Sequence, residues 1–270
     1  RGCMISIILI LLFVFSVLSV PVCHGVISGL YLYGMKIFPG LFISFILTNI
    51  LVRILQQKNI NNPWILVITG LMTGFPNGAY ICSWYNKNNP ENRLGDMLAG
   101  IINIPSPAFL ISYVYINILE KCISLPMFLA LTYTPVILCS YMAILFFRDK
   151  DNKKDNAPHI KNDKKLIFHF FEEAVDSSIN TALKLGAYVI IFSVIVNIIM
   201  HFSQSNTAGL LISYLFEISN GLAIIKNAGI PMNITVLLTV LLDAFGGVCI
   251  IMQTKSICSS YISIKKYIYQ

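Results

Sequence analysis

The sequence predicts an all-α polytopic membrane protein, and three observations support that fold class. Hydrophobic residues make up 56% of the chain and charged residues only 11%, whereas soluble domains carry about 25% charged residues. Several apolar runs approach the roughly 20 residues that a helix needs to cross the bilayer. Some of these runs are interrupted at their centres by glycine, proline and asparagine. Such interrupted segments are typical of binding sites in transporters.

The apolar runs predict the elements in chain order. The run at 4–23 lacks the small-residue cleavage site of a signal peptide, so it is interpreted as a helix. The remaining predicted elements are spans at 26–52, 95–118 (interrupted at 103–107), 126–147, 173–200 and 233–264 (interrupted at 243–247), with shorter or broken segments at 64–84 and 208–225.

The segment at 64–84 carries the motif GLMTGFPNGA at 70–79. Irregular backbone is tolerated at membrane depth only where protein or a water-filled cavity covers it. Two interpretations remain open, a re-entrant hairpin and a span kinked at Pro76. Basic residues of short loops favour the cytoplasmic side. If 64–84 and 208–225 both re-enter, nearly all basic loops and both termini are cytoplasmic, and only Lys121 and Lys226 lie outside. We therefore expect re-entrant hairpins.

The two halves of the chain resemble each other in the order of their polar features, and re-entrant hairpins would give them opposite orientations. This predicts two inverted-topology repeats. The matched features are Lys36 to Asn49 with Lys184 to Asn197, Asn77-Gly78 with Asn220-Gly221, and the break at Asn103 with the break at Asp243. The predicted parts are an N-terminal transmembrane helix (1–25), a first repeat (26–120), a connecting transmembrane helix (121–147), a charged cytoplasmic linker (148–172) and a second repeat (173–270).

Glu217 and Asp243 are acidic residues inside apolar stretches. Each costs about 2.5–3.5 kcal/mol at mid-bilayer, so such residues usually face a cavity or a partner. The alternatives are that Glu217 pairs with Lys184 or Lys226, and that Asp243 caps a half-helix. Uncharged polar residues on the broken segments complete the expected substrate-binding set, although each could also join helices by hydrogen bonding. The full set is Thr73, Asn77, Asn103, Ser106, Glu217, Asn220, Asp243 and Gln253.

Charge on the substrate is suggested by two features. Lys36 and Lys184 either reach toward the membrane interface or attract an anion from two sides. Facing half-helix N-termini would also expose free N–H groups suited to a carboxylate or phosphate. The net charge of +7 does not suggest nucleic-acid binding, because the basic residues fall mainly in short loops.

The sequence gives no sign of an enzyme, a cofactor or a metal centre. The seven cysteines include no CxxC pair and stand apart from the histidines, whereas metal sites need clustered ligands. No motif brings a nucleophile within reach of a base.

Several motifs resemble the YlbJ-type sporulation integral membrane proteins, a family with the nucleoside-recognition Gate domain. The resemblance is carried by GLMTGFPNGA at 70–79, NIPSP at 103–107, EA at 173–174 leading to LGAYVIIF at 185–192, LFEISNG at 215–221 and FGGVCIIMQ at 245–253. Lys36 and Lys184 do not belong to that pattern. The resemblance implies a concentrative-nucleoside-transporter-like fold and a role in endospore formation, with movement of dipicolinic acid as the task. It also implies a bacterial cell membrane, including the mother-cell-derived membrane around the forespore.

We therefore expect a permease for a small polar, anionic metabolite, with the lipid bilayer and a small-molecule substrate as partners. Further copies of the chain or other sporulation membrane proteins are also expected partners. The alternative is a non-transporting membrane component that assembles or anchors a sporulation complex. It predicts polar residues that pack against each other without a cavity, and a protein-binding linker at 149–163.

Overall fold

All regular structure in the described part of the chain is helical, as the composition predicted. The computed structural model describes residues 2–57, 62–88, 94–147, 164–203, 212, 215–258, 262–263 and 267. Within it, three helices are long and apolar enough to cross a membrane, at Leu125–Phe147, Phe171–Ser203 and Met232–Ser256. A bent pair of helices, Ser19–Ile37 with Leu41–Ile54, adds a fourth candidate if the two helices are counted as one span. The protein is therefore an all-α integral membrane protein.

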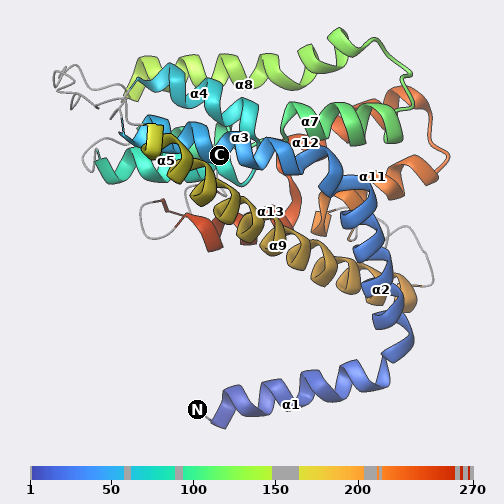
Figure 1. Ribbon diagram of the computed structural model, residues 1–270. Helices are drawn as coiled ribbons and strands as arrows, with labels where there is room; N and C mark the ends of the chain where they lie inside the picture. Colours follow the sequence, from blue (N-terminus) through green and yellow to red (C-terminus); the bar gives the residue numbers. More distant parts are fainter. Residues whose placement is uncertain are drawn as a thin grey trace.

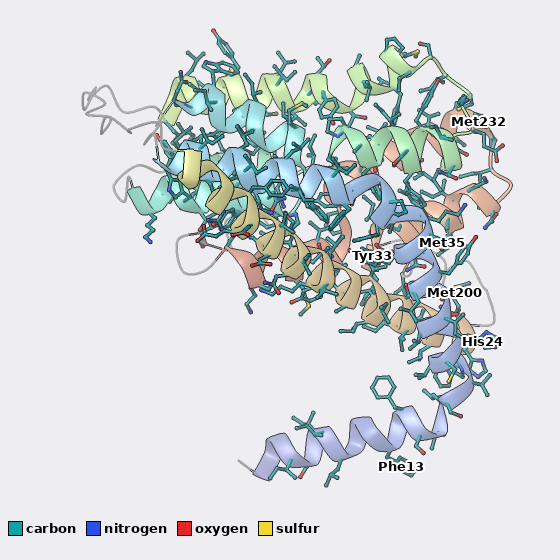
Figure 2. All side chains as sticks on the ribbon, viewed as in Figure 1. Phe13, His24, Tyr33, Met35, Met200 and Met232 are labelled. Atoms are coloured by element: carbon teal, nitrogen blue, oxygen red, sulfur yellow. The ribbon has the colours of Figure 1, made fainter. Side chains whose placement is uncertain are left out.

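The run predicted as one span at 4–23 is divided into two helices. Helix α1 (Gly2–Val17) ends just before Leu18, and α2 (Ser19–Tyr31) follows. Pro21 explains the break, because its ring lacks an N–H and clashes with the carbonyl four residues earlier, that of Val17. Helix α1 projects away from the other helices (Figure 1). Its Phe13, labelled in Figure 2, is 70% exposed.

The predicted span at 26–52 is bent rather than straight. After α2 the chain forms a π-helical stretch, η1 (Leu32–Ile37), and then α3 (Phe38–Gln57). The axis turns by 70° between the two parts. Pro39 and the π-helix are both known causes of such kinks. The bend brings α3 across the centre of the molecule, whereas α2 lies along α9 (Lys164–Ser203).

Helices α2 and α9 approach each other closely over two glycines. A Cβ on Gly25 would lie 2.5 Å from Cα of Val194, and one on Gly29 would lie 2.9 Å from Cα of Ile190. Small residues at such positions let helix backbones pack tightly in a membrane. Tyr33 extends this contact, since its hydroxyl donates a hydrogen bond to the carbonyl of Ala182 at 2.6 Å (Figure 2).

The segment at 64–84 forms two short helices, α4 (Pro63–Thr73) and α5 (Asn77–Asn88). Gly74 between them has φ +70°, and the Phe75–Pro76 peptide bond is cis. Helix α4 has 11 residues and is about 16 Å long, too short to span the bilayer alone. The two helices pack against each other at one end of the molecule (Figure 1).

The span predicted at 95–118 is interrupted where the sequence placed the break. Helix α6 (Leu94–Ile101) ends before Asn103, and α7 (Pro107–Phe109) continues into the π-helical η2 (Leu110–Ile118). The two breaks contact each other directly, because the N–H of Phe75 donates to the carbonyl of Ile104 at 2.9 Å.

The remaining helices follow the prediction in outline. Helix α8 (Leu125–Phe147) is continuous. Helix α11 (Ile218–Asn227) is short, and the last span divides into α12 (Met232–Phe245) and α13 (Gly247–Ile257) around Gly246. The linker at 148–163, most of 204–214 and the basic pair at 265–266 lie outside the described residues.

The buried apolar side chains form two clusters. One joins η1, α3, η2, α8, α9, α11 and α12, with Phe45 and Phe128 among its largest members. The other joins α4, α5, α6 and α8 with Cys258. Many large apolar side chains on the outer faces stay exposed, such as Leu145 at 59% and Leu183 at 67%. Such a surface suits contact with lipid rather than water.

Candidate functional site

A small cavity lies where the broken segments meet, and we call it the inner cavity. Its polar side chains come from the end of α4 (Thr73), the residue before α7 (Ser106), the residue before α11 (Glu217) and helix α13 (Gln253). The cavity volume is about 20 Å³. Half of the predicted set therefore shares one space. The other lining residues are Ile37, Leu41, Phe45, Phe75, Phe109, Leu185, Val189, Ile218, Ser219 and Ile250.

Among the described residues, Glu217 is the only charged side chain that lines the inner cavity, and it is 1% exposed. Its Oε2 accepts hydrogen bonds from the backbone N–H of Asn220 at 2.6 Å and from Nδ2 of Asn220 at 3.0 Å. Ser219 adds hydrogen bonds from its backbone and hydroxyl. The carboxylate thus caps α11, as acidic residues do at helix N-termini.

The ion pairs expected as an alternative for Glu217 are not formed. Lys226 instead contacts Oε1 of Glu120 at 2.7 Å. Lys184 lines a different cavity, described below. Within the described residues, no Lys, Arg or His side chain forms an ion pair with Glu217.

Gln253 is the second notable polar residue of the inner cavity. It is 2% exposed, and its Nε2 donates to Sγ of Cys249 at 3.1 Å. Its Oε1 is buried without a hydrogen-bond partner. Buried acceptors usually have a partner, so this oxygen is an available ligand atom.

The expectation of free helix N-termini is corrected by the structure, because the protein's own side chains occupy them. Oδ1 of Asn103 accepts from the N–H of Ala79 in α5 at 3.2 Å, and Oγ of Ser106 accepts from the N–H of Phe109 at 3.3 Å. Glu217 does the same for α11. The anion site expected from exposed N–H groups is therefore not present at these three helices.

Four predicted residues do not line the inner cavity. Nδ2 of Asn103 donates to Oγ1 of Thr254 at 3.1 Å and to the hydroxyl of Tyr267 at 2.7 Å. Nδ2 of Asn220 donates to Oγ of Ser193 at 2.8 Å. These three hydrogen bonds match the alternative in which such residues join helices. Asn77 lies in the second cavity.

Asp243 is the fourth of these residues, and it lies on α12 with no exposed surface. Both of its carboxylate oxygens lack a hydrogen-bond partner within the described structure, as does Oγ1 of Thr239 one turn earlier. It lines neither cavity. It also does not cap a half-helix, because it sits inside α12 with its oxygens unbonded.

The second cavity is a polar cleft of about 490 Å³ between α3, α5, α9 and α13. Arg53 and Glu173 form an ion pair across it, with side chains 29% and 42% exposed. Lys184 also lines it. The cleft residues are Asn49, Arg53, Asn77, Tyr80, Glu173, Asp176, Ser177, Asn180, Thr181, Lys184 and Ser256.

Sequence reasoning missed most of this polar cleft. The signal was present in α9, where Asp176, Ser177, Asn180, Thr181 and Lys184 recur at helical spacing and so share one face. The mean hydropathy of the span at 173–200 is high, so its single polar face does not stand out in the sequence. Lys36, by contrast, lies in η1 and lines neither cavity.

A narrow junction separates the polar cleft from the inner cavity. Pro76 and Tyr188 line this junction, together with residues that also line the polar cleft or the inner cavity. Lys184 and Ser256 also line the cleft, whereas Leu185 and Gln253 also line the inner cavity. The two cavities are thus neighbours along α9 and α13.

Searches of protein-family models, of curated proteins and of solved structures find no match to this chain. The class of protein that the fold and the site define is an all-α integral membrane protein with a buried polar site between broken helices.

Proposed function

We propose that this protein is a membrane permease for a small polar metabolite, and that the solute binds in the polar cleft beside the inner cavity. The observation that carries the proposal is the inner cavity itself. It joins Thr73 and Ser106 from the first half to Glu217 and Gln253 from the second. In secondary transporters, broken helices of two repeats meet at the binding site near the membrane midplane.

The order of the elements supports two inverted repeats. The first would comprise the bent pair α2–α3, the hairpin α4–α5 and the interrupted span α6–η2. The second would comprise α9, the segment ending in α11, and the interrupted span α12–α13. Packing of α4 against α5 supports the re-entrant interpretation over a single kinked span. Rocking of one repeat against the other would then open the site alternately to each side.

The cleft carries Arg53 and Lys184 together with Glu173 and Asp176, so its formal charges cancel. Arg53 pairs with Glu173, whereas neither Lys184 nor Asp176 forms an ion pair within the described residues. Lys184 is therefore the group that an anionic solute would contact. A cleft of about 490 Å³ lies within the size range of small-molecule sites. The resemblance to sporulation membrane proteins makes dipicolinate the first solute to test, with a role in endospore formation.

Uptake of radiolabelled dipicolinate into proteoliposomes tests this function. We compare the wild type with Glu217→Gln in the inner cavity and Asn77→Ala in the cleft. Glu172→Gln is the matched control, because Glu172 is exposed on α9 and lines neither cavity. We expect uptake by the wild type and the control, and its loss in both site variants. Equal uptake in all four proteins would remove the site assignment.

The second candidate is a non-transporting component that anchors a sporulation complex. The observation in its favour is that the amide nitrogens of Asn103 and Asn220 donate hydrogen bonds to other segments of the chain. Deleting residues 149–163 distinguishes the two functions. An anchoring protein would lose its partner and its effect on sporulation, whereas a permease would keep solute uptake.

A further inference from the structure

We propose that the inner cavity binds one sodium ion through Glu217, Gln253 and the neighbouring hydroxyl groups. The binding itself depends only on the geometry of the cavity. The role of the ion as the coupling ion of transport rests on the proposed permease function.

The first argument is charge. Glu217 is 1% exposed and receives N–H hydrogen bonds from Asn220, which match an ionised, acceptor-only carboxylate. No cationic side chain of the described residues pairs with it. An uncompensated charge buried in protein is strongly unfavourable, and either a cation or a proton removes this cost.

The second argument is the ligand set. The polar side chains that line the cavity offer oxygen ligands, namely the carboxylate of Glu217, the amide oxygen of Gln253 and the hydroxyls of Thr73, Ser106 and Ser219. Oxygen ligands suit hard cations. A single carboxylate matches one positive charge, whereas calcium sites in proteins usually combine several carboxylates. No cluster of His, Cys, Asp and Glu typical of a transition metal occurs in the described part of the chain.

The third argument is that one of these oxygens has no other role. Oε1 of Gln253 is buried, has no hydrogen-bond partner among the described residues and belongs to a side chain that lines the cavity. Leaving such a buried acceptor unsatisfied is unfavourable, because its desolvation is not compensated. A sodium ion between Gln253 and Glu217 would satisfy the amide oxygen and the carboxylate together.

The fourth argument is size. The inner cavity holds about 20 Å³, and a single water-sized occupant needs about 10–15 Å³ or more on this measure. A metabolite does not fit in this conformation, whereas a monovalent ion does. The polar cleft, at about 490 Å³, is the space that accommodates a solute. Ion and solute are thus assigned to adjacent cavities.

The position of the site also allows a bound ion to stabilise one arrangement of the helices. Its ligands come from α4, from the residues that precede α7 and α11, and from α13. An ion bound to all of them stabilises the arrangement in which these segments meet. By linkage, any solute that favours the same arrangement binds more tightly when sodium is present.

The test is thermal unfolding of the purified full chain in detergent micelles. NaCl replaces choline chloride at constant ionic strength, and KCl is the second reference salt. A ligand that binds only the folded state raises the unfolding midpoint in a concentration-dependent manner. We expect a saturable rise with sodium that exceeds any rise with potassium.

Two site variants and two controls identify the ligands. Glu217→Gln should abolish the sodium-dependent shift, and Gln253→Met should weaken the apparent sodium affinity by about 10-fold or more. Glu172→Gln and Asn227→Ala, which change exposed residues outside both cavities, should retain the full shift. If Glu217→Gln does not fold, Thr73→Val removes one hydroxyl at nearly constant shape and should lower the affinity.

An unchanged sodium shift in Glu217→Gln or Gln253→Met would overturn the proposal. So would a wild-type midpoint that responds to pH and not to sodium, which would assign the site to a proton. Sodium binding without solute uptake would leave the ion site standing and reject the permease function. Solute uptake without any effect of sodium would support the permease function and reject the ion site.

Discussion

The inner cavity and the polar cleft are neighbours, yet they are built on different principles. The inner cavity is lined mainly by aromatic and aliphatic side chains, and two of its polar residues, Ser106 and Glu217, cap helices. The cleft is wide, and its charged groups are only partly buried. The apolar lining of the inner cavity therefore contributes packing, whereas the cleft contributes exposed polar and charged groups. Substitutions in that apolar lining should cost stability, and substitutions in the cleft should cost function with little loss of stability.

The largest loss of stability should come from Gly74→Ala, at the break beside the inner cavity. Gly74 has φ +70°, and an added Cβ would lie 2.4 Å from the backbone nitrogen of Ser106. Backbone strain and overpacking together should cost about 4 kcal/mol. The matched control is Gly229→Ala, with φ +63° and no atom within 4 Å, which should cost only about 1–2 kcal/mol. Unfolding in mixed micelles measures both, and equal losses would contradict this packing.

A direct comparison of the two cavities uses Phe45→Ala and Lys184→Ala. Phe45 lines the inner cavity and is 1% exposed. Its removal should cost about 3 kcal/mol through lost packing. Lys184 is exposed in the cleft, so its removal should change the free energy of unfolding by less than about 0.5 kcal/mol. Solute uptake should nevertheless fall in Lys184→Ala. If Lys184→Ala instead lost stability and kept its uptake, the cleft would depend on packing, contrary to this comparison.

A smaller effect should follow from Glu173→Gln, which removes the ion pair with Arg53 in the cleft. Both side chains are partly exposed, and such pairs contribute about 0–1 kcal/mol. We expect a loss of stability in this range that shrinks at high salt, because solvent ions screen exposed charges. A loss that is several times larger and independent of salt would mean that the cleft is dry.

The smallest effect should come from Glu120, which lies outside the spans between η2 and α8. The hydrogen bond from Lys226, with the charge of the same side chain, lowers the pKa of Glu120 below its ordinary value of 4.5. A depressed pKa means that the stabilisation is complete above the ordinary pKa and is lost as the pH falls through the folded-state pKa. Thermal unfolding of Glu120→Gln should lack this acidic decline, while the wild type retains it.

The breaks in the spans were predictable because their chemistry is local. Glycine and proline mark the breaks at Gly74 and Gly246, and both occur where expected. The break at Leu18 and the bend before α3 also have local causes in Pro21 and Pro39. Neither of these two interruptions was predicted, because the high hydrophobicity of each run indicated one continuous span.

The composition of the site was predictable only in part, because it depends on which side chains other segments occupy. Thr73, Ser106, Glu217 and Gln253 meet as expected. Asn103 and Asn220 were expected beside them on the same grounds. Their amides are instead bound to Thr254, Tyr267 and Ser193, far away in sequence. No local pattern distinguishes an amide that binds a solute from one that joins two helices.

The central claim is that α4 and α5 form a hairpin that enters and leaves the membrane on one side. Cysteine accessibility tests it most directly, with Asn62→Cys and Lys87→Cys introduced singly into a cysteine-free background. Both positions are exposed, at the start of α4 and the end of α5. A membrane-impermeant thiol reagent should label both from the same face of sealed vesicles. Labelling from opposite faces would contradict the hairpin, and with it the site between the two halves.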